Sequence, residues 1–205
     1  MSQTAPNTPR LPLEVTVNPS LRATPLIALF AALLAVLGLI PKIDVPLGVP
    51  ITLQTLGVML AGCLLGPKRG LQALLLFLFA VALGLPLLSG GRGGLGVFFA
   101  PSSGYLLGWP LGAWVTGWLM ALLPSRSPRS ASISAFIASA LGGLLVVHVC
   151  GVVGLVLLAN LTWAQAALGT LVFVPGDLIK CQLCALVVLS VARGMPDWHF
   201  GGRTI

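Results

Sequence analysis

Charged side chains are scarce in this sequence. Only 4 of its 205 residues are Asp or Glu and 11 are Lys or Arg, so charged residues make up 7% of the chain. Soluble domains usually carry about 25%. The mean hydropathy is +1.05, and 57% of the residues are hydrophobic. These values exclude an ordinary soluble domain and indicate an integral membrane protein.

Motifs for catalysis and for metal binding are also missing. A P-loop ATPase needs Gly-Lys followed by Ser or Thr, whereas Lys42, Lys68 and Lys180 are followed by Ile, Arg and Cys. Neither an HExxH zinc motif nor a GxSxG nucleophile motif occurs. The pair Cys181 and Cys184 lacks the further ligands that a structural zinc site needs. We therefore predict that the chain is not an enzyme and holds neither a metal nor a cofactor of its own.

Six apolar runs fill most of the chain, and most of them approach the roughly 20 residues of a transmembrane helix. Proline and glycine separate them, as at Gly66-Pro67, because proline cannot continue a helix. We expect an all-α integral membrane protein, a compact bundle of six transmembrane helices in residues 25–193. A flexible N-terminal tail (1–24) and a short C-terminal tail (194–205) would flank it. The runs are Pro25–Ile40, Leu47–Gly66, Gly70–Leu88, Gly104–Leu123, Ala131–Ala159 and Ala166–Ala192.

Basic residues fall unevenly on the two sides of such a bundle. Lys and Arg are enriched in cytoplasmic loops, so both termini should be cytoplasmic. Because the basic residues are spread over short loops, the net charge of +7 does not indicate a nucleic-acid binder. Counted in alternate loops, one side holds Lys42 and Arg92, and the other holds Arg10, Arg22, Lys68, Arg69, Arg126, Arg129, Arg193 and Arg203.

Two charged side chains lie inside the sixth run, at Asp177 and Lys180. Each costs about 2.5–3.5 kcal/mol to insert near the centre of a membrane helix. Three residues apart, they share one helix face and can partly neutralise each other. Asp177 can accept N–H groups from a ligand, and Lys180 can donate to a carbonyl or carboxylate. The alternatives are a structural ion pair, or a membrane enzyme that uses Asp177 as an acid or base.

A glycine-rich loop, Ser89–Gly96, lies on the non-cytoplasmic side by this count. Its glycines, Gly91 among them, let the backbone approach a ligand closely and move as a lid. Arg92 offers a fork of donors for a carboxylate. Since the sixth run enters from the same side, Asp177 would lie at mid-depth below this loop. We expect a pocket that opens to the outside; the alternative is a mobile loop with a solvated arginine.

Other polar side chains give weaker signals. Thr52, Gln54 and Thr55 open the second run, where they can line the same outer half or cap the helix. Tyr105 can form a ligand wall or serve as an interfacial aromatic residue. We interpret His148 as a hydrogen-bonded helix contact rather than a proton relay, because its own run holds no acidic neighbour.

The first run carries a stripe of small side chains, spaced at i, i+3, i+4 and i+7. Such a stripe lets another helix approach closely. That helix can belong to a partner protein or to the bundle itself. The stripe consists of Ala28, Ala31, Ala32 and Ala35.

Five motifs closely resemble the BioY family, the biotin-binding S components of energy-coupling factor (ECF) transporters. They occur in the family's order, and the resemblance covers roughly residues 25–193. One departure is Ser102, which stands where the family is expected to have threonine and keeps the hydroxyl. The motifs are Val49-Pro-Ile-Thr-Leu-Gln-Thr-Leu-Gly57, Leu65-Gly-Pro-Lys-Arg-Gly70, Gly90-Gly-Arg-Gly-Gly-Leu-Gly96, Pro101-Ser-Ser-Gly-Tyr105 and Pro175-Gly-Asp-Leu-Ile-Lys180.

The resemblance implies a six-helix subunit that captures biotin from the outside. The ureido group of biotin would face Asp177 and Lys180, and its carboxylate would lie near Arg92. Lys180 could instead serve the carboxylate, since the sequence does not decide between them. The other residues expected in the site are Tyr105, Gln54 and Gly91.

The resemblance also implies partners in the lipid bilayer of a prokaryotic plasma membrane. S components dock through a small-residue first helix onto a transmembrane coupling subunit that two ABC-type ATPases drive, so ATP would be used by other chains. The alanine stripe matches this docking helix. A solitary biotin transporter, acting without the module and as a homo-oligomer, is the alternative.

Overall fold

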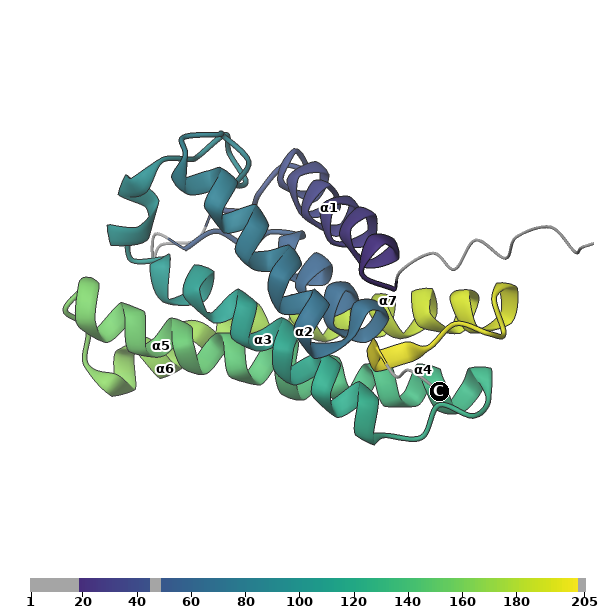
Figure 1. The fold of residues 1–205 in the computed structure, drawn as a ribbon. Helices are drawn as coiled ribbons and strands as arrows, with labels where there is room; N and C mark the ends of the chain where they lie inside the picture. Colours follow the sequence, from purple (N-terminus) through teal and green to yellow (C-terminus); the bar gives the residue numbers. More distant parts are fainter. Residues whose placement is uncertain (1–18, 45–48, 203–205) are drawn as a thin grey trace, which may run out of the picture.

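The computed structural model describes residues 19–44 and 49–202, with side chains from Thr24 onward. These residues form seven α-helices and four short 3-10 or π segments, and within them β-structure is limited to two isolated bridges. Figure 1 shows the helices packed side by side in one bundle. The predicted all-α fold is confirmed for this part of the chain. The helices are α1 (Pro19–Gly38), α2 (Gln54–Ala82), α3 (Ser103–Leu122), α4 (Pro128–Ala138), α5 (Val147–Leu158), α6 (Trp163–Thr170) and α7 (Val174–Gly194).

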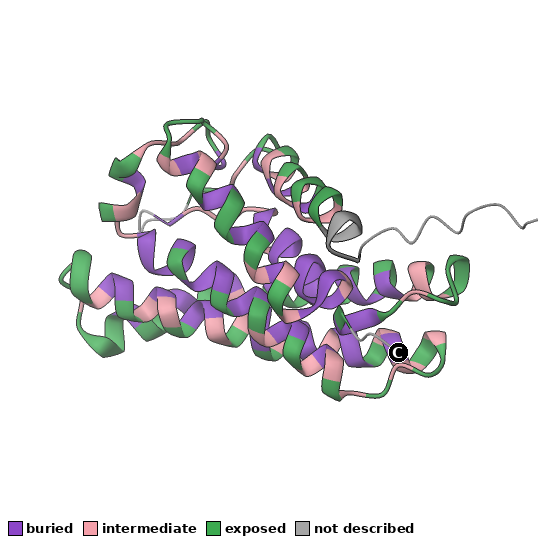
Figure 2. Ribbon diagram, in the orientation of Figure 1, coloured by how far each residue is buried: buried purple, intermediate pink, exposed green. Residues whose placement is uncertain are grey.

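Several helices are long and apolar enough to cross a membrane. By length and composition three stretches qualify, Gln54–Ala82, Pro128–Leu158 and Trp163–Gly194, and Thr24–Gly38 is a shorter apolar helix. Figure 2 shows buried residues where the helices meet and many exposed residues on their outer faces. An outer surface rich in large apolar side chains suits lipid better than water. Examples of these exposed side chains are Leu29, Phe79, Leu157 and Ile179.

Helix α2 folds back on itself at Gly66. A straight helix of its 29 residues would be about 44 Å long. Yet Gln54 at its start donates a hydrogen bond to the backbone oxygen of Leu87, which lies beyond its end. Gly66 has a left-handed φ of 81° and a ψ of −179°, and Pro67 follows it. The break expected at Gly66-Pro67 is therefore present, and it divides α2 into a first arm and a second arm.

Two predicted helix boundaries are wrong, both at the end of the bundle where α2 starts and finishes. The second apolar run begins at Leu47, outside the described residues, but the helix starts only at Gln54. The third run reaches Leu88, but the helix ends at Ala82. Val49 and Leu88, at the far ends of these non-helical stretches, are buried and line a cavity. The runs are longer than the helices because apolar residues continue into the connecting segments, where Leu83 and Leu85 are exposed.

The sixth apolar run contains two helices rather than one. Helix α6 ends at Thr170, a 3-10 turn covers Leu171–Phe173, and α7 begins at Val174 with Pro175 in its first turn. Proline is suited to that position because the first backbone N–H groups of a helix have no partner inside it. Asp177 therefore lies in the first turn of α7, directly after a 3-10 turn, within a helical stretch that runs from Trp163 to Gly194.

The chain ends differ in part from the predicted tails. Helix α1 begins at Pro19, earlier than the expected Pro25, and residues 1–18 lie outside the described part. At the other end, the segment after α7 packs on the turn of α2. There, Trp198 donates a hydrogen bond from Nε1 to the backbone oxygen of Leu64 (3.3 Å), and Phe200 is buried. The predicted C-terminal tail is thus ordered against the bundle as far as residue 202.

Gly66→Ala is expected to destabilise the protein. An added Cβ would lie 2.4 Å from the backbone oxygen of Gly201, and a φ of +81° is strained for any residue with a side chain. Strain alone costs about 1–3 kcal/mol, and the clash adds to it, so the melting temperature in detergent should fall. Gly84→Ala is the matched control, because its φ is +102° but no atom lies within 4 Å of the added Cβ. Equal melting temperatures for the two variants would contradict close packing at the turn.

Candidate ligand-binding site

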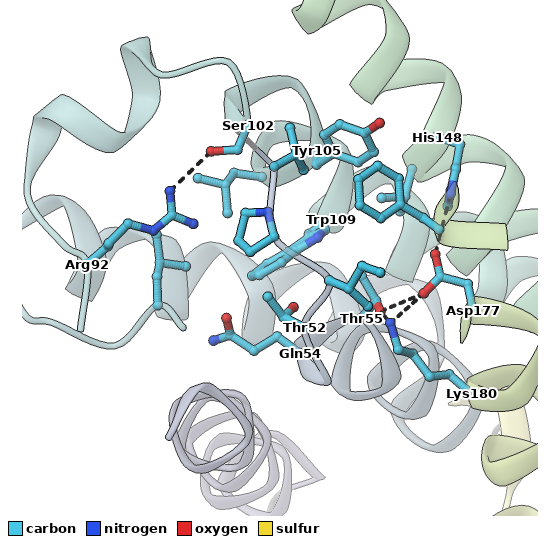
Figure 3. A pocket seen from close by; sticks show the side chains of 17 residues that line it. Thr52, Gln54, Thr55, Arg92, Ser102, Tyr105, Trp109, His148, Asp177 and Lys180 are labelled. Carbon is cyan, nitrogen blue, oxygen red and sulfur yellow. Dashed lines mark hydrogen bonds and ion pairs between the residues drawn. The ribbon is translucent and has the colours of Figure 1, made fainter. Parts of the chain in front are cut away.

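A cavity of about 550 Å³, which includes its opening to solvent, lies between both ends of α2, the loop before α3, and helices α3, α5 and α7. The wall is mixed, with apolar side chains interrupted by polar ones (Figure 3). The polar and aromatic residues labelled in this view are Thr52, Gln54, Thr55, Arg92, Ser102, Tyr105, Trp109, His148, Asp177 and Lys180.

One end of the cavity is formed by a buried ion pair. Lys180 donates from Nζ to Oδ1 of Asp177 (2.5 Å), and the two side chains are only 6% and 4% exposed. Thr55, from the first arm of α2, donates to the same oxygen (3.2 Å) and accepts a hydrogen bond from Lys180 (2.9 Å). An ammonium group has three hydrogens, so one hydrogen of Lys180 is left over for a ligand acceptor. The structure thus joins Asp177 and Lys180 as the i, i+3 spacing predicts.

His148 lies on the other side of Asp177. Its Nε2 is 3.4 Å from Oδ2 of Asp177, and its Nδ1 is 2.8 Å from the backbone oxygen of Leu144. The imidazole packs edge-on against Tyr105 and Phe173, with ring centroids 6.0 and 6.2 Å away. This pairing with Asp177 could not be predicted from the sequence, since the two residues are on different helices. The hydrogen-bonded helix contact expected for His148 is present. In addition, His148 has an acidic neighbour, Asp177, which comes from another helix.

Trp109 is a site residue that sequence reasoning missed. It is 4% exposed, lines the cavity and stacks at a tilt on Phe77, with ring centroids 6.1 Å apart. Its Nε1 is buried, and no hydrogen-bond partner for it occurs among the described residues. A buried N–H without a partner is costly, so this atom suits a ligand acceptor. Trp114 and Trp118, on the same helix, are exposed and stacked on each other. The sequence alone does not show which of the three tryptophans of this helix is buried.

Arg92 lies at the opposite end of the cavity from Asp177 (Figure 3). It donates from Nη1 to the hydroxyl of Ser102 and from Nε to the backbone oxygen of Ser89, both at 3.4 Å. These contacts turn the guanidinium toward the cavity rather than into solvent. Gly91, also expected in the site, is exposed and does not line the cavity, because the loop directs only its neighbour Arg92 inward.

Gln54 lines the cavity, but its amide is occupied. It donates from Nε2 to the backbone oxygens of Leu34 (3.0 Å) and Leu87 (3.1 Å), and its Oε1 accepts from the backbone N–H of Ser89 (3.1 Å). The side chain is 1% exposed. Gln54 therefore has a structural role, since it ties α1 and the loop before α3 to the start of α2, and its role in binding stays a prediction.

Tyr105 forms part of the wall, as expected, through its ring. Its hydroxyl is 2.7 Å from the hydroxyl of Thr170 on α6, and its ring lies edge-on to Phe173, with centroids 5.7 Å apart. A side chain at Gly151 would clash with this ring, because an added Cβ would be 2.3 Å from it. The Tyr105 ring is thus held in place on two sides and offers the cavity an apolar surface.

The alanine stripe of α1 is divided between two faces. Ala28 and Ala32 are exposed, whereas Ala31 and Ala35 are half-buried and pack against the core. Packing within the bundle therefore accounts for Ala31 and Ala35, and docking of a partner helix stays a prediction. Only the exposed pair is accessible to another helix.

Cysteine side chains cluster in the core below the ion pair. The Sγ atoms of Cys63 and Cys184 are 3.8 Å apart, and Cys181 contacts the sulfur of Met59 at 4.0 Å. In residues 19–44 and 49–202, groups of three or more His, Cys, Asp or Glu side chains suitable for a metal are not found. The cluster is a packing feature of the described structure.

A cavity that carries a buried ion pair, inside a bundle of membrane-length helices, defines a ligand-binding membrane protein. The profile of the BioY family matches residues 9–197, and the chain belongs to this family. The resemblance inferred from the five motifs is confirmed, and the match is longer than the segment that those motifs span.

Curated relatives and a solved structure agree with this assignment. The biotin transporter BioY of Rhizobium etli is 45% identical over 180 residues, which cover 86% of this chain and 96% of that protein. The biotin transporter BioY of Rhodobacter capsulatus is 44% identical over 186 residues, with the same coverage of both chains. The crystal structure of the S-component for biotin from an ECF-type ABC transporter matches with a TM-score of 0.78 at 32% identity, over 87% of this chain and 95% of that one.

Gln54→Met is expected to lower the melting temperature of the protein in detergent. The variant keeps the side-chain length but leaves the buried backbone groups of Leu34, Leu87 and Ser89 without their partner, at a cost of about 1–3 kcal/mol each. Gln72→Met is the matched control, because Gln72 is exposed on the second arm of α2. If both variants melt at the temperature of the wild type, Gln54 does not hold the loop.

Proposed function

We propose that this protein is the substrate-binding subunit for biotin uptake, and that biotin occupies the cavity. The observation that carries the proposal is the separation of polar groups to the two ends of an apolar cavity. Asp177 and Lys180 lie at one end and Arg92 at the other. Biotin has the same division, with a ureido group at one end, a carboxylate at the other and an apolar bicycle and chain between them. The relatives named as biotin transporters support this assignment.

The ureido group is assigned to the ion-pair end. It offers two N–H donors and one carbonyl acceptor. Oδ2 of Asp177 can accept an N–H, because Lys180 and Thr55 both bind Oδ1. The remaining hydrogen of Lys180 and the unpartnered Nε1 of Trp109 can donate to the carbonyl. Each donor or acceptor with unused hydrogen-bonding capacity in this part of the cavity thus has a counterpart in the ureido group.

The carboxylate of biotin is assigned to Arg92 rather than to Lys180. The Lys180 ammonium is neutralised by a carboxylate that it already contacts. The charge of Arg92 is not balanced in this way within the described residues, since it donates to the neutral oxygens of Ser89 and Ser102. A guanidinium suits a carboxylate, which it can bind through two parallel N–H groups.

The bilayer placement follows from the distribution of basic side chains. We infer six membrane crossings, which are α1, the first and second arms of α2, α3, the stretch α4–α5 and the stretch α6–α7. Both termini are then cytoplasmic. Lys68 and Arg69 lie at the turn of α2, which packs on the C-terminal segment. Lys42 is at the opposite end, beside the glycine-rich loop, since a Cβ on Gly90 would lie 2.7 Å from its Cε. The cavity and Arg92 are at this outer end of the bundle.

The source of energy is proposed to be another set of chains. No P-loop occurs in the sequence, and the structural relative is the S-component of an ECF-type ABC transporter. We therefore propose that this chain acts in a prokaryotic plasma membrane with an ECF coupling subunit and two ABC-type ATPases. Uptake without the module, by this chain alone or as a homo-oligomer, is the second candidate; reconstitution with and without the module separates the two.

Loss of either member of the ion pair should weaken biotin binding. Asp177→Asn removes a charged acceptor, and Lys180→Met removes a charged donor. Each hydrogen bond to a charged group contributes about 1.5–3 kcal/mol, which corresponds to a roughly 10- to 150-fold increase in Kd. Calorimetric titration of purified protein with biotin measures the change. Retained affinity in both variants, or no biotin binding by folded wild-type protein, would contradict the proposal.

Arg92→Gln decides which cation binds the carboxylate. The variant should weaken binding of biotin at least tenfold, because a charged hydrogen bond is lost. It should leave binding of biotin methyl ester almost unchanged, since the ester carries no negative charge. Lys180→Met should weaken both ligands alike. If Lys180→Met instead weakens binding of biotin but leaves binding of the ester almost unchanged, the carboxylate lies at the Lys180 end.

The exposed part of the α1 stripe should be required for coupling to the module. Ala28→Leu combined with Ala32→Leu fills the surface that another helix would approach. Biotin uptake into proteoliposomes containing the coupling subunit and both ATPases should fall several-fold, while biotin affinity stays unchanged. Ala167→Leu is the control, because it adds the same side chain at an exposed position on α6. Normal uptake by the double variant would show that this face does not dock.

A further inference from the structure

His148 and Asp177 face each other in a way that requires a hydrogen atom between them. Nδ1 of His148 lies 2.8 Å from the backbone oxygen of Leu144. A carbonyl oxygen only accepts, so Nδ1 carries a hydrogen and, in a neutral imidazole, Nε2 is a bare acceptor. That Nε2 faces Oδ2 of Asp177 at 3.4 Å, and an ionised carboxylate also only accepts. Two acceptors therefore meet with no donor between them.

Burial makes this arrangement unfavourable unless the donor is supplied. His148 is 7% exposed and Asp177 is 4% exposed, so solvent has little access to the gap. Nε2 has no hydrogen-bond partner within the described structure. The hydrogen bonds from Lys180 and Thr55 go to Oδ1 and do not reach Oδ2. Protonation of the imidazole, or an N–H group of a ligand in the cavity, can supply this hydrogen.

The groups around His148 set the charge balance of the site. Asp177 and Lys180 face it from α7, Tyr105 from α3 with its hydroxyl bonded to Thr170, and the neutral Thr55 stands beside the ion pair on the first arm of α2. With a neutral imidazole, Asp177 and Lys180 cancel. With an imidazolium, the buried site carries one positive charge in excess, which is favourable only while Oδ2 accepts the Nε2 hydrogen.

We propose that ligand capture at this site is linked to release of one proton from His148. In the empty site, protonated Nε2 donates to Oδ2 of Asp177. This inference rests on the proposed function: when a ureido N–H of biotin donates to Oδ2, it replaces the imidazolium as donor. The imidazolium then has a buried charge without its partner and gives its proton to solvent. The only bond that breaks is Nε2–H, whose electron pair stays on the imidazole while the proton passes to solvent. His148 is thus a positioning residue that keeps Asp177 ready for an N–H donor.

The linkage has a definite sign. Since biotin displaces a proton, acid competes with the ligand, and the affinity rises with pH and weakens as pH falls. When one proton is released per ligand, the change reaches about tenfold in Kd per pH unit. Histidine is the side chain that changes charge between about pH 5 and 8, and carboxylic acids such as biotin are already ionised above about pH 6. A dependence in the range from about pH 6 to 8 therefore reports on histidine.

The test is calorimetric titration of the full-length protein in detergent with biotin at about pH 6, 7 and 8. Repeating each titration in buffers of different ionisation enthalpy counts the protons released. The variant is His148→Gln, and the matched control is His199→Gln, because His199 is exposed and is the only other histidine in the chain. Wild type and His199→Gln should release up to one proton, with Kd rising toward low pH. His148→Gln should release none and bind with a Kd that does not change with pH.

Several outcomes overturn the proposal. Biotin binding by wild type with no proton exchanged, or with proton uptake, removes the linkage while the proposed function stands. A pH dependence that persists in His148→Gln removes the assignment to His148. If wild type binds no biotin at any pH, the linkage and the proposed function fall together. Should His148→Gln melt far below wild type, the wild-type proton count still decides the linkage, and His148→Asn replaces the variant.

Discussion

The pairing of Asp177 with Lys180 inside an apolar bundle is the interaction to which the rest of the site is fitted. A buried charge without a partner costs several kcal/mol, and breaking a buried pair leaves that cost uncompensated. Two hydrogen-bond donors reduce this cost here. Lys180 and Thr55 both donate to Oδ1 of the carboxylate.

This constraint explains local features that otherwise look unrelated. The 3-10 turn Leu171–Phe173 and Pro175 directly precede Asp177 in the helical stretch Trp163–Gly194. The first arm of α2 begins at Gln54, which puts Thr55 in its first turn and against the pair. The same Gln54 holds the loop that carries Arg92. The two polar ends of the cavity are thus fixed relative to each other by one short stretch of α2, and the loop is anchored at its start rather than free to move as a whole.

Local patterns gave the helical fold and the ion pair, because both depend on residues close in sequence. The break at Gly66-Pro67 and the i, i+3 spacing of Asp177 and Lys180 are examples. Contacts between distant helices could not be predicted. His148 was interpreted without an acidic neighbour, since Asp177 follows 29 positions later on another helix. Gln54 was expected to bind the ligand because it is a polar residue beside the predicted pocket. The sequence does not reveal that its amide already bonds to backbone groups of other segments.

The central claim is that biotin lies in this cavity with its ureido group at Asp177 and Lys180 and its carboxylate at Arg92. The most direct measurement is an experimental structure of the protein with biotin bound. We predict ligand density that fills the cavity, with a ureido N–H at Oδ2 of Asp177, the ureido oxygen at Lys180 and Trp109 Nε1, and the carboxylate at the guanidinium of Arg92. Biotin in the reverse orientation, or bound outside this cavity, would contradict the claim.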